Sequence, residues 1–159
     1  MSHVVFLALG SNLGDRLGNL QAALAALPPL VRVQSASPVY ETPPWGYLEQ
    51  PAFLNQAARV ETDLPPQELL AYLKRLETQI GRTPAVRYGP RVIDVDIVFY
   101  DDLVLDTPEL TIPHPGLVGR AFVLAPLADL AAELRHPVEG KTMGELLAEV
   151  DASGISLFE

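Results

Sequence analysis

Two aspartates, Asp94 and Asp96, stand two positions apart inside segment 91–100, the most β-prone run of the chain. Side chains of a β-strand alternate between two faces, so both carboxyl groups are predicted to point the same way. The opposite face would then carry Ile93, Val95, Ile97 and Phe99. Acidic residues are depleted in strands, and carboxylates about 6.5–7 Å apart can converge on one hard cation or bridge two. The spacing therefore predicts a Mg²⁺ site that also takes substrate phosphates.

A cationic loop precedes this strand. Segment 78–93 contains no acidic residue, although the chain has 20 of them, and it holds Arg82, Arg87 and Arg91. Guanidinium groups beside a carboxylate-bound metal suit phosphoryl transfer, because both neutralise charge on phosphate oxygens. The alternative is a salt-bridge cluster at the protein surface, since clustered charges also occur in purely structural roles.

The composition is that of a globular protein, with 48% apolar and 19% charged residues among 159. This length predicts a single domain, residues 1–159. There is no apolar run of membrane-spanning length, no recognisable signal peptide and no cysteine, so we expect a cytoplasmic protein without disulfides. The net charge of −9 argues against non-specific nucleic-acid binding, because such proteins carry a basic surface.

The hydrophobic pattern predicts strands at 4–9, 30–40, 52–62 and 91–100, with helices at 16–27 and 66–80. This order is that of the ferredoxin-like βαββαβ fold of the α+β class. It predicts an antiparallel sheet with both main helices on one face and loops on the other. A C-terminal hairpin (103–105 with 110–112) and helices at 119–128 and 142–150 are expected to follow. Asp15 and Thr142 are the predicted helix N-caps.

Four further segments carry residues suited to a ligand, each with a structural alternative. Loop 41–47 contains two prolines, Trp45 and a tyrosine, which suits a flat ligand or a lid over the core. Asn55, unusual inside a strand, could present a donor and an acceptor to a ring edge, or belong to a β-bulge. His114 lies between two prolines, which suits a ligand contact or a simple corner. Segment 10–14 resembles a phosphate loop slightly but lacks the Gly-Lys-Ser/Thr of a Walker motif, and a strand-to-helix turn explains it without a ligand.

Several of these motifs occur together in an order typical of one family. The stretches concerned are residues 8–14, 41–46, 53–55, 81–82, 87–91, 94–97, 113–115 and 120–123. They resemble the 6-hydroxymethyl-7,8-dihydropterin pyrophosphokinases of folate biosynthesis over nearly the whole chain. The arginine loop leading into Asp94 and Asp96 is the most specific of these features. The chain departs from the family pattern at 83–85, Tyr88 and Glu109, positions that concern closure on ATP.

The resemblance implies a Mg²⁺-dependent enzyme that transfers diphosphate from ATP to the hydroxymethyl group of a dihydropterin and releases AMP. Asp94 and Asp96 would hold two Mg²⁺ ions and would form the catalytic set together with Arg82 and Arg91. The residues implied to line the pterin pocket are Thr42, Pro43, Pro44, Trp45, Phe53, Asn55 and Phe122. Those implied to surround ATP are Glu77, Arg82, Arg87, Arg91, Ile97, Thr111, His114 and Arg120.

The implied partners are the two small-molecule substrates, with no nucleic acid and no membrane, in a monomer or a homodimer.

Two other classes of protein explain part of the sequence. A non-catalytic ferredoxin-like module that binds an effector would explain the fold and the pocket, but not Asp94 and Asp96 beside three arginines. RNA binding by a four-stranded sheet would need exposed aromatic residues and a basic surface, and the acidic balance argues against it.

Overall fold

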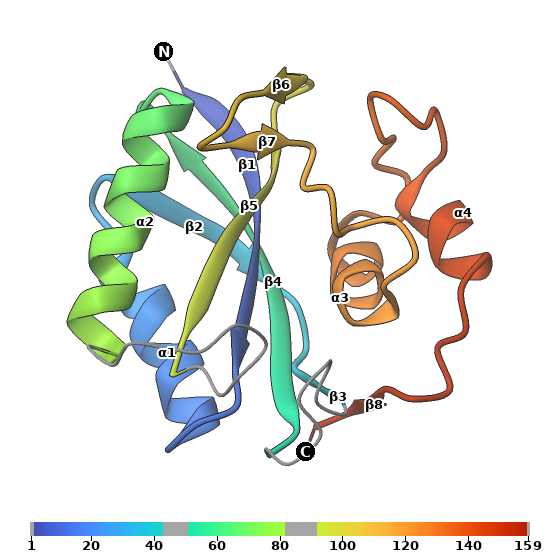
Figure 1. Ribbon diagram of the computed structural model, residues 1–159, viewed down its shortest axis with the longest axis horizontal. Helices are drawn as coiled ribbons and strands as arrows, with labels where there is room; N and C mark the ends of the chain where they lie inside the picture. The colour runs from blue at the N-terminus through green and yellow to red at the C-terminus, as the bar shows by residue number, and fades with distance from the viewer. Residues whose placement is uncertain (1, 43–50, 82–91, 159) are drawn as a thin grey trace.

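The computed structural model describes residues 2–42, 51–81 and 92–158, and its centre is an antiparallel sheet. In this part of the chain the sheet comprises β1 (His3–Ser11), β2 (Val31–Ala36), β3 (Tyr40–Thr42), β4 (Phe53–Thr62), β5 (Asp94–Tyr100) and β8 (Ser156–Leu157). The strand order is β5-β1-β4-β3-β8, and β2 also pairs with β4 (Figure 1). The expected hairpin is formed by β6 (Leu105–Asp106) and β7 (Thr111–Ile112). A mixed α and β protein with an antiparallel sheet is therefore confirmed.

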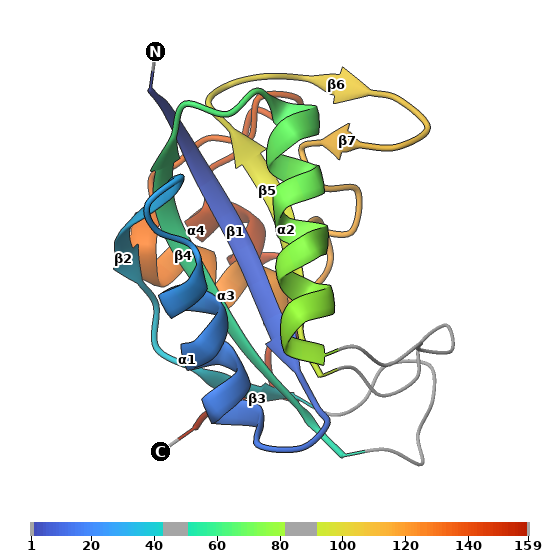
Figure 2. The ribbon, with the colours of Figure 1, turned by 90° about the vertical axis from the view of Figure 1, so that its left-hand side faces the viewer.

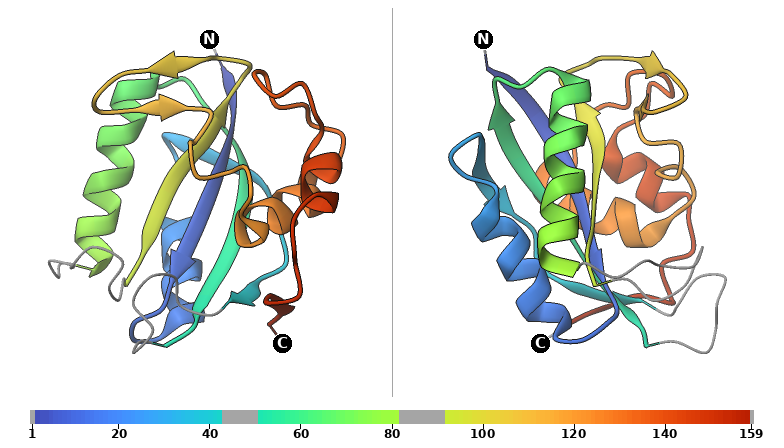
Figure 3. Two further views of the ribbon diagram at one scale, coloured as in Figure 1. Left: turned by 45° about the vertical axis from the view of Figure 1, so that its right-hand side comes forward. Right: turned by 60° about the vertical axis from the view of Figure 1, so that its left-hand side comes forward.

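Helices cover both faces of this sheet. The helices are α1 (Arg16–Ala26), α2 (Pro66–Gly81), α3 (Ala121–Ala131) and α4 (Met143–Ala148). Helices α1 and α2 lie side by side on one face, as predicted, whereas α3 and α4 lie on the other (Figures 1 and 2). The prediction that only loops occupy that second face is wrong. Leu124 and Leu127 of α3 belong with Phe6 of β1 to a second apolar core on this face. Figure 3 shows the position of α3 relative to the sheet in two further views.

The helix starts follow the local signals in the sequence. Asp15 caps α1, with its carboxylate accepting the backbone N–H of Gly18 at 3.1 Å. Thr142 and Glu145 form the predicted capping box at the start of α4. Both caps satisfy backbone donors that have no partner inside the helix. No helix in the described ranges is long and apolar enough to cross a membrane.

A register shift in β5 changes the side-chain alternation near its end. Phe6 of β1 pairs with Phe99, but the next residue, Leu7, pairs with Ile97, so Val98 is the extra residue. Val98 and Phe99 consequently both belong to the core under α3, whereas Ile97 packs under α1 and α2. The prediction that Phe99 shares a face with Ile97 is wrong, because a bulge inserts one residue into the two-residue period.

The single strand expected at 30–40 is two strands. A register shift separates Val33 from Ser35 in the pairing of β2 with β4, and Pro38 then offers no backbone N–H. Between β2 and β3, the hydroxyl of Ser37 serves as an acceptor for β4 and binds the N–H of Ala57 at 2.9 Å. The chain resumes as β3, which pairs with the start of β4, and this second pairing brings Thr42 opposite Phe53.

Candidate active site

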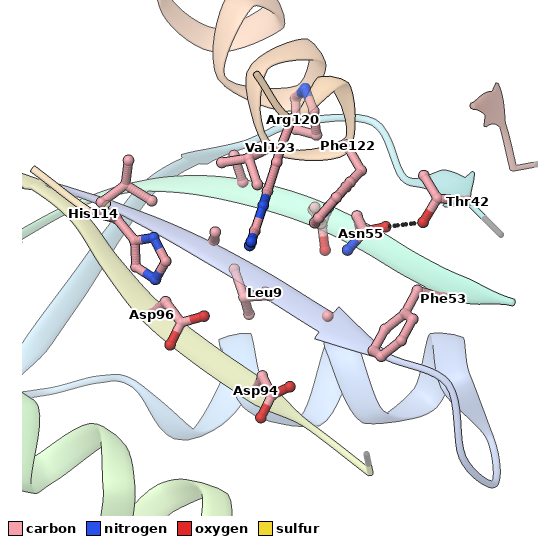
Figure 4. Close-up of a pocket in the computed structure, with 16 residues that line it drawn as sticks. Leu9, Thr42, Phe53, Asn55, Asp94, Asp96, His114, Arg120, Phe122 and Val123 are labelled. Carbon is pink, nitrogen blue, oxygen red and sulfur yellow. Dashed lines mark hydrogen bonds between the residues drawn. The ribbon is translucent and has the colours of Figure 1, made fainter. Parts of the chain in front are cut away.

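A cavity of about 220 Å³ lies on the α3 face of the sheet (Figure 4). Its walls come from β1, β3, β4, β5, the segment before α3 and the first turns of α3. The lining residues are Ala8, Leu9, Gly10, Thr42, Phe53, Asn55, Gln56, Ala57, Asp94, Asp96, Val98, His114, Arg120, Phe122, Val123 and Pro126. The site thus combines apolar and aromatic walls with a few convergent polar groups, as small-molecule sites commonly do.

Asp94 and Asp96 point into this cavity from β5, as the alternation predicted (Figure 4). Both side chains are half-buried, whereas Val95 between them is buried under α1 and α2. Across the ladder, Gly10 pairs with Asp94 and Ala8 with Asp96. Because these partners on β1 are small, open space remains in front of both carboxyl groups. Among the described residues no third His, Cys, Asp or Glu joins the pair in a metal-binding group.

The amide of Asn55 is held in place by Thr42. Both residues are buried, and the hydroxyl of Thr42 donates to Oδ1 of Asn55 at 2.7 Å. The Nδ2 group of Asn55 approaches Gly10 so closely that a Cβ at Gly10 would lie only 3.3 Å away. Asn55 pairs with Gly10 and Tyr40 in an unshifted register, so the β-bulge alternative is wrong.

Two aromatic rings lie near this amide. Phe53 comes from β4 and Phe122 from the first turn of α3, and both line the cavity beside Asn55 (Figure 4). The guanidinium of Arg120 lies 6.0 Å from the centre of the Phe122 ring, within the range of a cation–π contact. The arrangement offers apolar ring surfaces next to a fixed amide, which suits a flat heteroaromatic ligand.

His114 lies beside Asp96, and Arg120 extends from the start of α3 into the cavity between His114 and Phe122 (Figure 4). The backbone N–H of His114 donates to the carbonyl of Val98 at 3.0 Å, and its Nδ1 accepts the N–H of Gly116 at 3.0 Å. The neutral ring therefore carries its proton on Nε2. Gly116 also leaves room for Arg120, because a Cβ there would lie 2.6 Å from Nη1. His114 thus forms a turn of the backbone and also lines the cavity, so the two alternatives for this residue occur together.

Three of the residues implied to surround ATP do not line this cavity. Glu77 accepts the N–H of Val95 at 2.7 Å at the outer edge of β5, and pairs with Lys74 at 3.3 Å. Burial raises the pKa of its carboxyl group. Ile97 is buried under α1 and α2, and Thr111 lies in β7. Their roles toward ATP stay predictions.

Six of the implied site residues lie outside the described ranges. They are Pro43, Pro44, Trp45, Arg82, Arg87 and Arg91. Conversely, the residue-by-residue interpretation of the sequence missed the contribution of Ala8 and Gly10. The available signal was the spacing of Ala8 and Gly10, two small residues two positions apart in the first strand. Both face the same side of the sheet as Asp94 and Asp96.

Comparisons with known proteins identify one family and several relatives that are similar to this chain. The 7,8-dihydro-6-hydroxymethylpterin-pyrophosphokinase (HPPK) family profile matches residues 6–132. The 2-amino-4-hydroxy-6-hydroxymethyldihydropteridine pyrophosphokinase of Pseudomonas aeruginosa is 44% identical, over 95% of this chain and 94% of that protein. The protein of the same name from Bacillus subtilis is 38% identical, over 100% of this chain and 92% of that protein.

Other relatives are much longer than this chain. The folic acid synthesis protein FOL1 of Dictyostelium discoideum is 45% identical over 86% of this chain, which spans only 21% of that protein. The solved structure of Plasmodium falciparum HPPK-DHPS with pterin and p-hydroxybenzoate matches with a TM-score of 0.76. The match covers 94% of this chain and 42% of the Plasmodium chain at 18% sequence identity, so it shows the shared fold alone. The match of the family profile and the full-length bacterial relatives establish that this chain belongs to the HPPK family.

Proposed function

We propose that the protein transfers diphosphate from ATP to the hydroxymethyl group of 6-hydroxymethyl-7,8-dihydropterin, giving AMP and the pterin diphosphate in folate biosynthesis. The observation that carries this proposal is the cavity itself. One end has a fixed amide between aromatic rings, and the other has two carboxylates with a histidine and an arginine nearby. A flat polar heterocycle and a polyphosphate would therefore meet in one site. Membership of the HPPK family and the names of the bacterial relatives support the same reaction.

The pterin would occupy the end of the cavity formed by β3, β4 and α3. Asn55 would read the polar edge of the ring through its amide, because Thr42 already occupies one lone pair of Oδ1. Phe122 and Phe53 would supply the apolar contacts to the ring. Pro43, Pro44 and Trp45 are proposed to complete this wall.

Mg²⁺ fits the donor set that β5 provides. Two half-buried carboxylates on one face of a strand are hard oxygen ligands, and Mg²⁺ commonly takes one or two of these and completes its shell with phosphate oxygens and water. Asp94 and Asp96 would hold two ions. Bound there, the metal would neutralise phosphate charge during the transfer. Carboxylates alone would repel ATP, so the proposed site also requires the cations around it.

The nucleotide would lie on the side of His114 and Arg120. His114 presents Nε2–H as a donor for a phosphate oxygen, because Gly116 occupies Nδ1. Arg120 would add a charge-assisted bond. The residues proposed in addition for ATP are Glu77, Arg82, Arg87, Arg91, Ile97 and Thr111, with Arg82 and Arg91 stabilising the transferred group.

The chemistry needs little covalent work from the protein. The hydroxymethyl oxygen forms a bond to the β-phosphorus, and the bond from that phosphorus to the oxygen bridging the α-phosphorus breaks. AMP leaves with the bridging oxygen, and the hydroxyl proton passes to solvent. We assign no side chain as general base, so the rate would come from positioning and charge stabilisation.

The direct test is AMP release from ATP by the purified protein. We expect AMP and pterin diphosphate in equal amounts, and no AMP when either Mg²⁺ or 6-hydroxymethyl-7,8-dihydropterin is left out. Production of ADP in place of AMP would contradict diphosphate transfer. AMP release that does not depend on the pterin would contradict the acceptor.

The finer architectural assignments belong to the same proposal. The order β5-β1-β4-β2 and the helices α1 and α2 support a ferredoxin-like arrangement. We propose a single domain over residues 1–159 that acts as a monomer or homodimer in the cytoplasm on small molecules alone. Light scattering of the purified protein would measure its mass in solution.

A further inference from the structure

The turn between β1 and α1, together with the first residue of α1, contacts the chain next to the cavity wall that β3 and β4 form. The proposed site gives these residues no role. Asn12 is fully buried, and its side-chain amide donates to the carbonyl of Pro51 at 3.0 Å. Arg16, the first residue of α1, donates through Nη1 to the carboxylate of Glu41 at 2.8 Å and to the carbonyl of Ala52 at 2.9 Å. Asn12 and Arg16 thus bind two consecutive carbonyls, those of Pro51 and Ala52, directly before β4.

These contacts lie one residue away from the proposed pterin site. Glu41 precedes Thr42 and Ala52 precedes Phe53, and Thr42 and Phe53 are paired across β3 and β4. Arg16 therefore joins the two strands where their ladder ends. Arg16 thereby fixes the distance between β3 and β4 close to the point where Thr42 donates to Asn55, because Asn55 lies only two residues beyond Phe53.

The guanidinium of Arg16 is itself held by neighbouring groups. Its Cζ lies 5.7 Å from the centre of the Phe158 ring, and the N–H of Phe158 donates to the carbonyl of Val39 at 2.8 Å. The adjoining strand β8 pairs with β3, so the C-terminal residues brace both Arg16 and the strand it binds. A charge-assisted contact to a pre-positioned guanidinium loses little side-chain entropy when it forms.

We propose that Arg16, assisted by Asn12, is a positioning residue for the pterin-binding wall. It does not line the cavity, so it acts through Glu41 and Ala52 on Thr42, Phe53 and Asn55. This inference rests on the proposed function, since it assigns the pterin to that wall. The contacts of Arg16 go to Glu41, Ala52 and Phe158, so the nucleotide side of the site is expected to be unaffected by its loss.

The test is a comparison of Michaelis constants in the Arg16→Met variant, which keeps the aliphatic stem and loses the guanidinium. The KM for 6-hydroxymethyl-7,8-dihydropterin at saturating ATP and Mg²⁺ should rise about tenfold, because the bonds of Arg16 to Glu41 and Ala52 are lost. The KM for ATP at saturating pterin should stay within about twofold of the unmodified protein. Arg16→Lys, which restores the charge and one donor, should recover part of the pterin KM.

The matched control is Arg32→Met. Arg32 lies on β2, is about half exposed and pairs with Asp63 at 3.7 Å, so its loss should change neither KM. Equal increases in both constants, or an Arg16→Met variant indistinguishable from Arg32→Met, would overturn the inference. If the Arg16→Met variant does not fold, Glu41→Gln replaces it, and a pterin KM unchanged in that variant would overturn the inference too. Absence of AMP release by the unmodified protein would instead refute the proposed function.

Discussion

The hydroxyl of Thr42 in β3 donates to Oδ1 of Asn55 in β4 at 2.7 Å, and both side chains are buried at the edge of the cavity. The bond fixes which way the Asn55 amide faces, because a hydroxyl that donates can only be paired with the amide oxygen. The two residues are 13 positions apart in sequence and meet because β3 pairs with the start of β4.

Thr42→Val should weaken pterin binding and lower stability. Valine has nearly the same shape but leaves the buried oxygen of Asn55 without its donor, which costs about 1–3 kcal/mol of the free energy of unfolding. The amide could then rotate, so the KM for pterin should rise while that for ATP changes little. Urea denaturation and steady-state kinetics would measure both. Thr78→Val, at an exposed helix position, is the control and should stay within about 0.5 kcal/mol.

Asp96→Ala should lower turnover by roughly three or more orders of magnitude, since the loss of a proposed metal ligand leaves phosphate charge uncompensated. A Mg²⁺ titration of AMP release should not restore the rate at high metal concentration. Asp106→Ala, an exposed position on β6, should turn over normally. Near-normal turnover of Asp96→Ala at ordinary Mg²⁺ would rule out the metal-binding role.

Gly116→Ala should impair the nucleotide side of the site with little effect on folding. An added Cβ would lie 2.6 Å from Nη1 of Arg120 and 3.2 Å from Cε1 of His114. The guanidinium is the flexible end of its side chain and can move away, so the KM for ATP should rise about tenfold while the melting temperature changes little. Gly154→Ala, where a Cβ has no neighbour within 4 Å, is the matched control. Equal ATP constants in the two variants would contradict this role of Gly116.

His136 should make the protein less stable as the pH falls below about 6.5. Burial lowers the pKa of this imidazole, partly opposed by the charge of Glu139. Its Nδ1 accepts the N–H groups of Val138 at 3.1 Å and Glu139 at 3.0 Å, so protonation of that nitrogen would break both bonds. The unfolded chain binds the proton more readily, and the free energy of unfolding therefore falls from pH 6.5 down through the lower folded-state pKa.

The measurement is urea denaturation of the unmodified protein and of His136→Gln between pH 5 and pH 8. Glutamine does not titrate, so part of the pH dependence should disappear in the variant. A variant with the same slope as the unmodified protein in this range would show that His136 contributes nothing to it.

Features that depend on neighbours along the chain were predictable from the sequence. The N-cap at Asp15 and the shared face of Asp94 and Asp96 are of this kind, because capping and strand alternation involve only a few consecutive residues. The same local rule failed at Phe99, where the pairing of β1 with β5 inserts a residue. Nothing in the period of the sequence indicates that bulge.

By itself, the sequence determined the order of the main elements, the acidic pair on β5 and the family to which the chain belongs. Only the tertiary structure decided that α3 covers the second face of the sheet, that Thr42 orients Asn55, and that Arg16 reaches Glu41 and Ala52. The physical reason is that hydrophobic period and capping act over a few residues, whereas strand register and side-chain partners depend on segments brought together by packing.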